Sequence, residues 1–399
     1  MVSSYSVAPV SSIDGLSAAS SRISKAIIED HRRFFGGQKV FSSVDNRRLL
    51  EPLIGAHIND ASLADRWRAY DENYRTTARV SRFWITEIPE ATVFPGFGIV
   101  AAGNTILKDT VRNGDQLRSI FPGISPEHSR ALMSSPANRV ETNLSSPTRR
   151  IPGKSFHLGF GMFENYYNWM LRYASRIALY QAMEQPLRLI VPERKKRYIP
   201  ETLEFFGVRE DDVHFLTRPT IFERLVLVSP IALGRYELSP LMTQTLRSHP
   251  RVTGLWRQPK KKIYIPRRNV EMRSITNSAE VEALMKRHGF LIFDNAENPV
   301  SSQVRAFRDA SIVVGAHGAG LSNIVFSDPE TQVIEIVPEG YDQGVTSYRS
   351  LSDLFGLQYT QLFGKEVVLD RKGNRCNSDI EIDLAELSQV LKTLGAMGS

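Results

Sequence analysis

The sequence predicts an α/β protein of two domains, and three observations carry that prediction. The chain has 399 residues, of which 42% are hydrophobic. That length exceeds the roughly 100–200 residues of one ordinary domain. From Lys154 onward, segments with strand character alternate with segments of helical spacing. A β-branched run from Ile312 to Val314 then leads into a glycine-rich turn, which is typical of a parallel strand covered on both faces.

The N-terminal part has the weakest patterning. Residues 1–40 are rich in serine, and we expect an arm with one helix there. Between Ala78 and Lys108, short strand-like segments separated by turn signals indicate a small antiparallel β element. The segment from Gln116 to Pro152 is rich in proline, serine and arginine and is predicted to be a loop.

Residues 41–250 are assigned to an N-terminal, acceptor-side domain, and the βα alternation inside it predicts a Rossmann-like arrangement. A long helix is expected from Asn165 to Glu184. The strands are expected at residues 155–158, 187–191, 213–216 and 225–228.

Residues 251–399 are assigned to a second, ligand-binding domain. Its predicted elements are a strand at 262–265, a helix at 278–288, a strand at 312–314 and a strand at 332–337. The terminal segment from Asp383 to Leu394 carries leucines at helical spacing and is predicted to form an amphipathic helix.

The turn that follows Val314 is the strongest indication of a binding site. Three glycines, Gly315, Gly318 and Gly320, are expected to let the backbone turn tightly and approach a ligand. His317 lies among them, and the amides of the following helix favour a phosphate. The spacing fits neither the dinucleotide fingerprint nor the Walker loop, whose lysine is missing, which argues against hydride transfer and NTP hydrolysis.

Two arginines are expected to face the same crevice. Arg267 and Arg268 follow a short strand, and ligands of open α/β sheets bind outside the carboxyl ends of strands. Guanidinium groups donate in a fixed bidentate geometry that suits diphosphate oxygens. Glu335 interrupts an apolar run. Because an isolated buried carboxylate is costly, we expect it at an exposed strand end, where it meets hydroxyls or a cation.

Composition and charge indicate where the protein works. The single cysteine, Cys376, excludes an internal disulfide and favours a reducing compartment. No signal-peptide pattern and no apolar run near ~20 residues is present, so the bacterial cytoplasm is the expected location. The formal net charge is +7. Its basic runs suit solvated loops, or else a peripheral contact with the anionic inner membrane. No nucleic-acid-binding motif accompanies them, and nucleic acid is not an expected partner.

The order of motifs from Lys261 to Tyr359 resembles the C-terminal half of glycosyltransferase family 61, which includes capsular-polysaccharide-type bacterial enzymes and eukaryotic xylosyl- and N-acetylglucosaminyltransferases. The resemblance implies a GT-B fold, with two Rossmann-like domains facing a cleft. It also implies an inverting transfer from a nucleotide-diphosphate sugar, expected to be UDP-linked, with no obligatory metal and no further cofactor. The donor-side residues that it implies, with their flanking neighbours, are Arg267, Arg268, His317, Gly318, Ala319, Gly320, Asn323 and Glu335. An acid placed like Glu335 commonly holds the ribose in GT-B enzymes, and their last helix often crosses back to the first domain.

The acceptor side departs from the family pattern. Asn168 occupies the usual histidine position and Arg172 the usual acid position, and Asn165 opens the same segment. An inverting transferase needs a base for the acceptor hydroxyl, and neither Asn nor Arg serves near neutral pH. Glu164 and His157 are the nearest candidates for that base. His317 is a third, if the diphosphate does not occupy it. Arg172 suits an anionic group on the acceptor or donor.

These observations favour an inverting glycosyltransferase of bacterial surface polysaccharide synthesis, such as capsule or lipopolysaccharide. Its expected acceptor is a saccharide or a lipid-linked glycan. Two alternatives stay open. The replacements at Asn168 and Arg172 suit a non-catalytic nucleotide-sugar-binding or regulatory homologue. The basic runs alone suit a membrane-surface scaffold.

Overall fold

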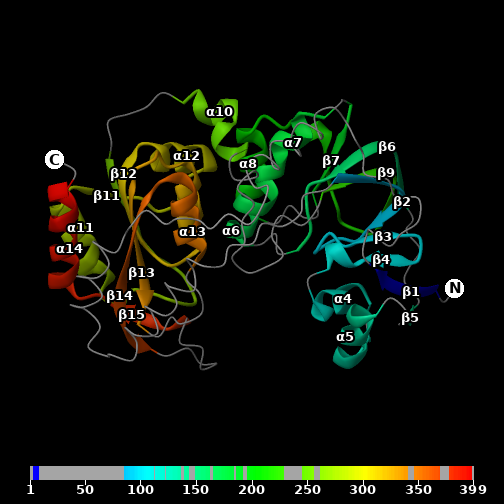
Figure 1. The fold of residues 1–399 in the computed structure, drawn as a ribbon, viewed down its shortest axis with the longest axis horizontal. Helices are drawn as coiled ribbons and strands as arrows, with labels where there is room; N and C mark the ends of the chain where they lie inside the picture. Colours follow the sequence, from blue (N-terminus) through cyan, green and yellow to red (C-terminus); the bar gives the residue numbers. More distant parts are fainter. Residues whose placement is uncertain are drawn as a thin grey trace. The chain divides into compact units, whose positions relative to one another are not determined.

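The computed structural model describes residues 3–8, 85–111, 113–121, 123–135, 139–142, 149–161, 165–183, 186–191, 196–228, 245–255, 261–339, 346–368 and 377–397. These residues separate into two compact units, one up to Val228 and one from Thr245 onward. Each unit contains a β-sheet with helices, so the prediction of an α/β protein is confirmed (Figure 1). Among the described residues, no helix combines the length and the apolar character that spanning a bilayer demands.

Within the described residues, the first unit has one sheet of nine strands in the order β5-β1-β4-β3-β2-β9-β6-β7-β8. Strands β9, β6, β7 and β8 run parallel to one another, and β2 pairs antiparallel with β9. The strands are β1 (Ser3–Ala8), β2 (Ile85–Val93), β3 (Val100–Ala102), β4 (Thr105–Leu107), β5 (Arg139–Thr142), β6 (Arg149–His157), β7 (Arg188–Val191), β8 (Val213–Phe215) and β9 (Thr220–Val228).

The antiparallel strands indicated between residues 78 and 108 are present as β2, β3 and β4. They are not a separate element, because β2 joins them to the parallel strands along the full register from Ile85 opposite Val228 to Val93 opposite Thr220. Of the predicted N-terminal arm, only Ser3–Ala8 lies within the described residues, where it forms β1 and pairs with β4 and β5.

The segment predicted to be a loop contains two helices, α4 (Gly114–Ile120) and α5 (Pro126–Ser134). Each begins at a capping residue: Asn113 accepts a hydrogen bond from the amide of Gln116, and Ser125 accepts one from the amide of His128. Such caps satisfy amides that have no partner inside the helix. The helices pack on β3 and β4 through a cluster that includes Leu117 and Leu132. The prediction of a loop is therefore wrong over these residues.

The long helix predicted from Asn165 to Glu184 is broken into short pieces. They are α6 (Tyr166–Asn168), the π-helical turn η3 (Trp169–Tyr173), the 3₁₀ turn η4 (Ala174–Arg176) and α7 (Ile177–Gln181). Single π-helical turns are rare and are frequently found at functional sites. Here Trp169, Met170 and Leu171 are completely buried, and α8 (Tyr198–Phe205) supplies Thr202, which accepts a hydrogen bond from the Trp169 indole at 3.0 Å.

Within the described residues, the second unit has a six-stranded sheet in the order β11-β10-β12-β13-β14-β15. The first five strands are parallel and β15 is antiparallel. The strands are β10 (Lys261–Ile265), β11 (Phe290–Ile292), β12 (Ala310–Ala316), β13 (Gln332–Pro338), β14 (Gln358–Val368) and β15 (Asp379–Glu381). The helices are α10 (Pro250–Thr253), α11 (Ser278–Arg287), α12 (Val300–Arg308), η6 (Ala319–Phe326), α13 (Thr346–Phe355) and α14 (Leu384–Met397).

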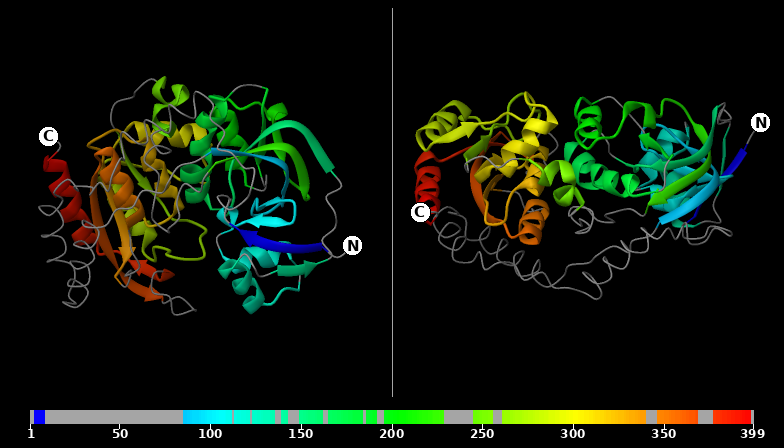
Figure 2. Two further views of the ribbon diagram at one scale, coloured as in Figure 1. Left: turned by 45° about the vertical axis from the view of Figure 1, so that its right-hand side comes forward. Right: turned by 90° about the horizontal axis from the view of Figure 1, so that it is seen from above.

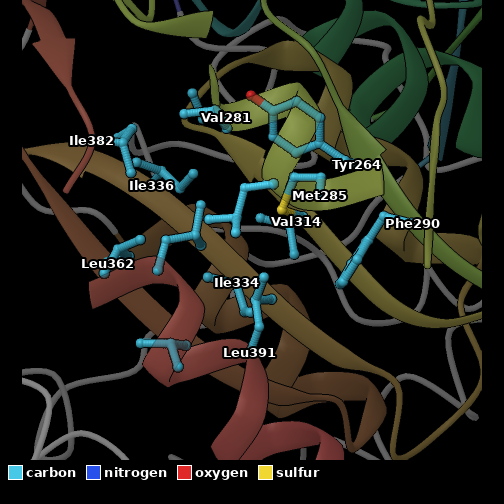
Figure 3. Packing of buried hydrophobic residues seen from close by; sticks show 14 of the residues in the cluster. Tyr264, Val281, Met285, Phe290, Val314, Ile334, Ile336, Leu362, Ile382 and Leu391 are labelled. Carbon is cyan, nitrogen blue, oxygen red and sulfur yellow. The ribbon is translucent and has the colours of Figure 1, made fainter. Parts of the chain in front are cut away.

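Helices α11 and α14 cover one face of this sheet (Figure 2), and a hydrophobic cluster lies between them and the strands (Figure 3). Ile334 and Ile336 of β13 pack there with Met285 of α11 and Leu391 of α14. Burying each such side chain stabilises the fold by ~1.5–3 kcal/mol. Because successive side chains of a strand point to opposite faces, Glu335 points away from this cluster. The apolar face of α14 is thus used inside the second unit, while a domain boundary at residue 250 stays a prediction.

Candidate functional site

The site in the second unit lies where the strand order reverses. Numbered by their order in the chain, the five parallel strands lie in the sheet as 2-1-3-4-5. From β10 the chain continues to β11 on one side, and from β12 it continues to β13 on the other side, although β10 and β12 are neighbours. Ligands of such sheets bind at this switch point, outside the carboxyl ends of the strands. Ile265 pairs with Gly315, so Arg267 and His317 both follow directly at that edge. The structure therefore brings together the two segments that sequence reasoning assigned to one crevice.

Arg267 lies beside the turn. Its Nε and Nη2 donate to the carbonyl of Met272 at 3.0 and 2.8 Å. Burial, and then the nearby charge of Arg273, lower the pKa of Arg267 to about 10. The guanidinium therefore keeps its charge at neutral pH, and two like charges are held near each other. Such a pair attracts an anion, because a diphosphate relieves the repulsion that the two guanidinium groups exert on each other.

Arg273 is the functional candidate that sequence reasoning missed. Its Nε donates to the carbonyl of His317 at 3.1 Å and its Nη1 to Oδ1 of Asn377 at 2.8 Å. Its φ of 59° lies in the left-handed region, which few residues other than glycine adopt. Strain of this kind is concentrated at binding and catalytic sites. In the sequence, Arg273 was marked only by its position, shortly after the strand that leads into Arg267 and Arg268.

His317 is held on several sides. Its amide donates to the carbonyl of Ile336 at 2.7 Å, and its Nδ1 contacts Oε1 of Glu335. Its ring centroid lies 5.5 Å from that of Tyr348, whose hydroxyl donates to the carbonyl of Gly318 at 2.6 Å. About a sixth of the side chain is exposed (17%). The imidazole is therefore both fixed and reachable.

Glu335 corrects an expectation. It is fully buried at 0% exposure in the middle of β13, not at an exposed strand end. The burial of a carboxylate is tolerated where hydrogen-bond donors compensate it. His317 meets Oε1, and the hydroxyl of Tyr359 in β14 donates to Oε2.

The turn glycines also act differently from the prediction. None of Gly315, Gly318 and Gly320 has a φ in the left-handed region, so no left-handed turn requires them. A β-carbon at Gly318 would lie 2.0 Å from Nη1 of Arg267, and one at Gly320 would lie 2.7 Å from Nδ2 of Asn295. At these two positions the ends of the protein's own side chains occupy the space that a β-carbon would take. Ala319 begins η6, and the first amides of a helix lack partners inside it and favour an anion.

Two predicted donor-side residues have structural partners. Asn323 is fully buried, and its Nδ2 donates to Oε1 of Gln303 at 2.8 Å. Gln303 in turn donates to the carbonyls of Asn295 and Asn298, which ties the turn to α12. Arg268 points to Glu282, to which its Nη2 donates at 2.7 Å. The structure thus places Arg267, and not Arg268, against the turn.

In the first unit, the candidate base His157 ends β6 and is completely buried. Burial, and then the charge of Arg176, lower the pKa of His157 to about 3. Full burial disfavours His157 as the group that takes a proton from an acceptor, and its catalytic role stays a prediction. Glu164, the other candidate in this unit, lies outside the described residues.

The acceptor-side residues lie in the broken helix. Asn165 is exposed and caps α6, accepting from the amide of Asn168 at 3.3 Å. Asn168 is buried, at 8% exposure. The guanidinium of Arg172 lies 6.0 Å from the centroid of the Tyr167 ring. Their contact with an acceptor stays a prediction. Among the described residues, no cluster of three or more His, Cys, Asp or Glu side chains could hold a metal ion.

Two arginines beside a helix start at a switch point are features that sites for phosphorylated ligands share. The sequence model of the family Glycosyltransferase 61 matches residues 166–334, somewhat less than half of the chain. The matched part includes β10, β12 and the turn with His317. The resemblance stated from the motifs is thereby supported over these residues, while kinship with the capsular-polysaccharide type stays a prediction.

Three curated plant proteins are similar over shorter stretches. A "Beta-1,2-xylosyltransferase" of Arabidopsis thaliana is 30% identical over 100 residues, which are 25% of this chain and 17% of that protein. "Beta-1,2-xylosyltransferase RCN11" of Oryza sativa subsp. japonica is 48% identical over 42 residues, 10% and 8% of the two chains. "Alpha-1,3-arabinosyltransferase XAT3" of the same rice is 28% identical over 133 residues, 32% and 22%. The matches span less than a quarter of the length of each relative.

Proposed function

We propose that this protein is a glycosyltransferase that takes a sugar from a nucleoside-diphosphate donor and transfers it to a glycan. The observation that carries the proposal is the pair Arg267 and Arg273 beside the turn at the β10–β12 switch point. In the transition state the leaving diphosphate gains negative charge. Fixed positive groups and helix amides stabilise such charge without reorganising.

Donor and acceptor have separate places in this proposal. The second unit holds the nucleotide sugar, and the first unit presents the acceptor across a GT-B cleft. The similarity to xylosyl- and arabinosyltransferases favours a pentose as the first donor sugar to try. A UDP-linked donor, inversion at the anomeric carbon and independence of metal belong to the same proposal. So do a bacterial surface polysaccharide as product and a cytoplasmic location at the inner membrane.

The catalytic base remains to be assigned by experiment. Burial disfavours His157, and two candidates are left, Glu164 and His317. Loss of a general base lowers transfer by ~10²–10⁴-fold. To separate the candidates, the rate of sugar transfer and the affinity for the donor are measured for Glu164→Gln and for His317→Gln. A base lowers kcat and leaves donor affinity near the wild-type value, whereas a diphosphate ligand loses affinity as well.

The proposal is tested by titrating the purified protein with UDP, GDP, CDP, UDP-xylose and UDP-arabinose, and by following thermal unfolding and slow donor hydrolysis. A ligand at 100 times its Kd stabilises the folded protein by ~2.7 kcal/mol. A transferase is supported if nucleotides with one base raise the unfolding temperature and the protein slowly hydrolyses the corresponding nucleotide sugar. If none of these nucleotides stabilises the protein, the proposal is contradicted.

A non-catalytic nucleotide-sugar-binding homologue is the second candidate. The observations in its favour are that Asn168 stands at the position where the family usually has histidine, and that His157 is completely buried. This candidate predicts binding with no turnover, even when glycan acceptors are supplied. The membrane-surface scaffold rests on basic runs that lie only partly within the described residues, and it predicts salt-sensitive binding to anionic vesicles.

A further inference from the structure

The buried carboxylate of Glu335 is committed on both oxygens. His317 meets Oε1 through Nδ1, and Tyr359 donates its hydroxyl to Oε2. Glu335 has no exposed surface, whereas part of His317 is exposed. A ligand that arrives at the turn therefore reaches the imidazole before it reaches the carboxylate.

The hydrogen positions follow from the partners. An ionised carboxylate only accepts, so Nδ1 of His317 must carry a proton and donate it. Burial, and then the nearby Glu335 carboxylate, raise the pKa of Tyr359 well above its ordinary value, so its phenol also stays a donor. A buried carboxylate that accepts from Nδ1 fixes the orientation of the imidazole. In the imidazolium form both ring nitrogens donate, so Nε2–H is then directed at an anion.

We propose that Glu335 is a positioning residue, which accepts from Nδ1 and orients the ring of His317 so that Nε2–H of the imidazolium donates to the donor diphosphate. This proposal rests on the proposed function. It differs from the role that the family resemblance implied for Glu335, because a carboxylate with no exposed surface, directed at His317 and Tyr359, is not placed to meet a ribose hydroxyl.

Two further contacts support this assignment. The ring of Tyr348 lies against His317 and its hydroxyl holds the Gly318 carbonyl, while Arg273 holds the carbonyl of His317 itself. Tyr348 of α13 thus restrains the ring of His317, and Arg273, in the loop before α11, restrains its backbone carbonyl. Such restraint serves binding to a fixed anion, since a group that is already oriented loses little freedom on binding.

Nitrogen-15 NMR of histidine-labelled protein tests the positioning without any ligand. We expect a His317 signal with a hydrogen-bonded proton on Nδ1 in the wild type and in Tyr359→Phe, where the carboxylate remains. We expect that signature to be lost or shifted in Glu335→Gln, which keeps the shape of the side chain and removes its charge. A wild-type ring protonated on Nε2 alone contradicts the proposal.

Binding measurements separate the two roles of Glu335. Inorganic pyrophosphate has no ribose, whereas UDP and GDP do. A positioning role predicts that Glu335→Gln weakens pyrophosphate and the nucleoside diphosphate by the same factor, roughly tenfold, as losses of such supporting partners do. In a protein that already carries His317→Ala, the Glu335→Gln change should not weaken the binding of either ligand further. Weaker nucleoside diphosphate binding with unchanged pyrophosphate binding overturns the proposal and assigns Glu335 to the ribose.

A variant that fails to fold does not stop the test. Thermal unfolding first checks Glu335→Gln, and Tyr359→Phe serves as the milder variant, for which we expect a smaller and again equal loss for both ligands. If the wild type binds none of pyrophosphate, UDP and GDP, the proposed function fails. In that case the nitrogen-15 signal of His317 still tests, without any ligand, whether Glu335 positions the imidazole.

Discussion

Arg267 fills the space that a side chain at Gly318 would need. A β-carbon built on Gly318 lies 2.0 Å from Nη1 of Arg267, and the φ of 174° at Gly318 is one that any residue adopts. A larger residue at this position would therefore displace the guanidinium, whereas the backbone itself accepts any residue. This packing holds a charge that stays positive at neutral pH directly against the turn.

Gly318→Ala should consequently damage binding more than folding. The new methyl group pushes the guanidinium of Arg267 away, and we expect nucleoside diphosphate affinity to fall about tenfold, in line with the loss of one charge-assisted hydrogen bond. Isothermal titration with UDP or GDP measures the change. In an Arg267→Ala background the same substitution should have almost no further effect, because residues in contact couple. Full additivity of the two losses contradicts this packing account.

The adjacent arginines provide a matched comparison. Arg267→Met should lower nucleoside diphosphate affinity by at least about tenfold, because it removes a positive charge beside the turn. Arg268→Met should change affinity little, because Arg268 is an exposed partner of Glu282. Surface pairs of that kind contribute only ~0–1 kcal/mol to stability. Equal losses in both variants would show that Arg268 also reaches the ligand.

Asn323→Ala tests whether the buried amide supports the turn or touches the donor. Its removal leaves Gln303 Oε1 without the bond at 2.8 Å, and we expect unfolding to become easier by ~1–3 kcal/mol. Urea unfolding measures the loss, and Gln303→Ala should produce one of similar size. At low temperature the remaining folded protein should bind nucleoside diphosphate nearly as well as the wild type. A large loss of affinity in fully folded Asn323→Ala would restore the donor-binding assignment.

His157 should make the first unit sensitive to acid. Its folded-state pKa of about 3 lies below the ordinary value of 6.5, so between these two pH values the unfolded chain binds a proton that the folded chain does not. The stability that this group contributes is present above pH 6.5 and is lost as the pH falls toward 3, by up to ~1.4 kcal/mol per pH unit.

Urea unfolding of the wild type and of His157→Leu between pH 7 and 5 measures this effect. The variant should lose less stability than the wild type over that range. The exposed His128 provides the control, since His128→Gln should keep the wild-type slope. Identical slopes for the wild type and His157→Leu would mean that the buried imidazole is not kept neutral.

Sequence reasoning located the site but could not assign its side chains. The β-branched run and the glycines of the turn placed His317 at a strand end, and parallel pairing of β10 with β12 brought Arg267 beside it. Nothing local separates Arg267 from Arg268, because the difference lies in Glu282, fourteen residues further on. The burial of Glu335 was equally invisible, since its compensating partner Tyr359 is 24 residues away on the next strand.

In the first unit some signals were present and others were not. Asn113 and Ser125 are capping residues before α4 and α5, and Pro126 follows Ser125 at the first helical position, so both helices could have been predicted. The π-helical turn at Trp169–Tyr173 has no glycine or proline to announce it. It comes with tertiary burial of Trp169 and its neighbours, which local sequence does not encode.

The most direct test of a donor diphosphate site at the β10–β12 switch point is hydrogen exchange by mass spectrometry, with and without the nucleoside diphosphate that stabilises the protein. We predict slower exchange of the amides in residues 267–273 and 315–321, and loss of that protection in Arg267→Met. Unchanged exchange in both segments while the nucleotide is bound elsewhere on the chain would contradict the account.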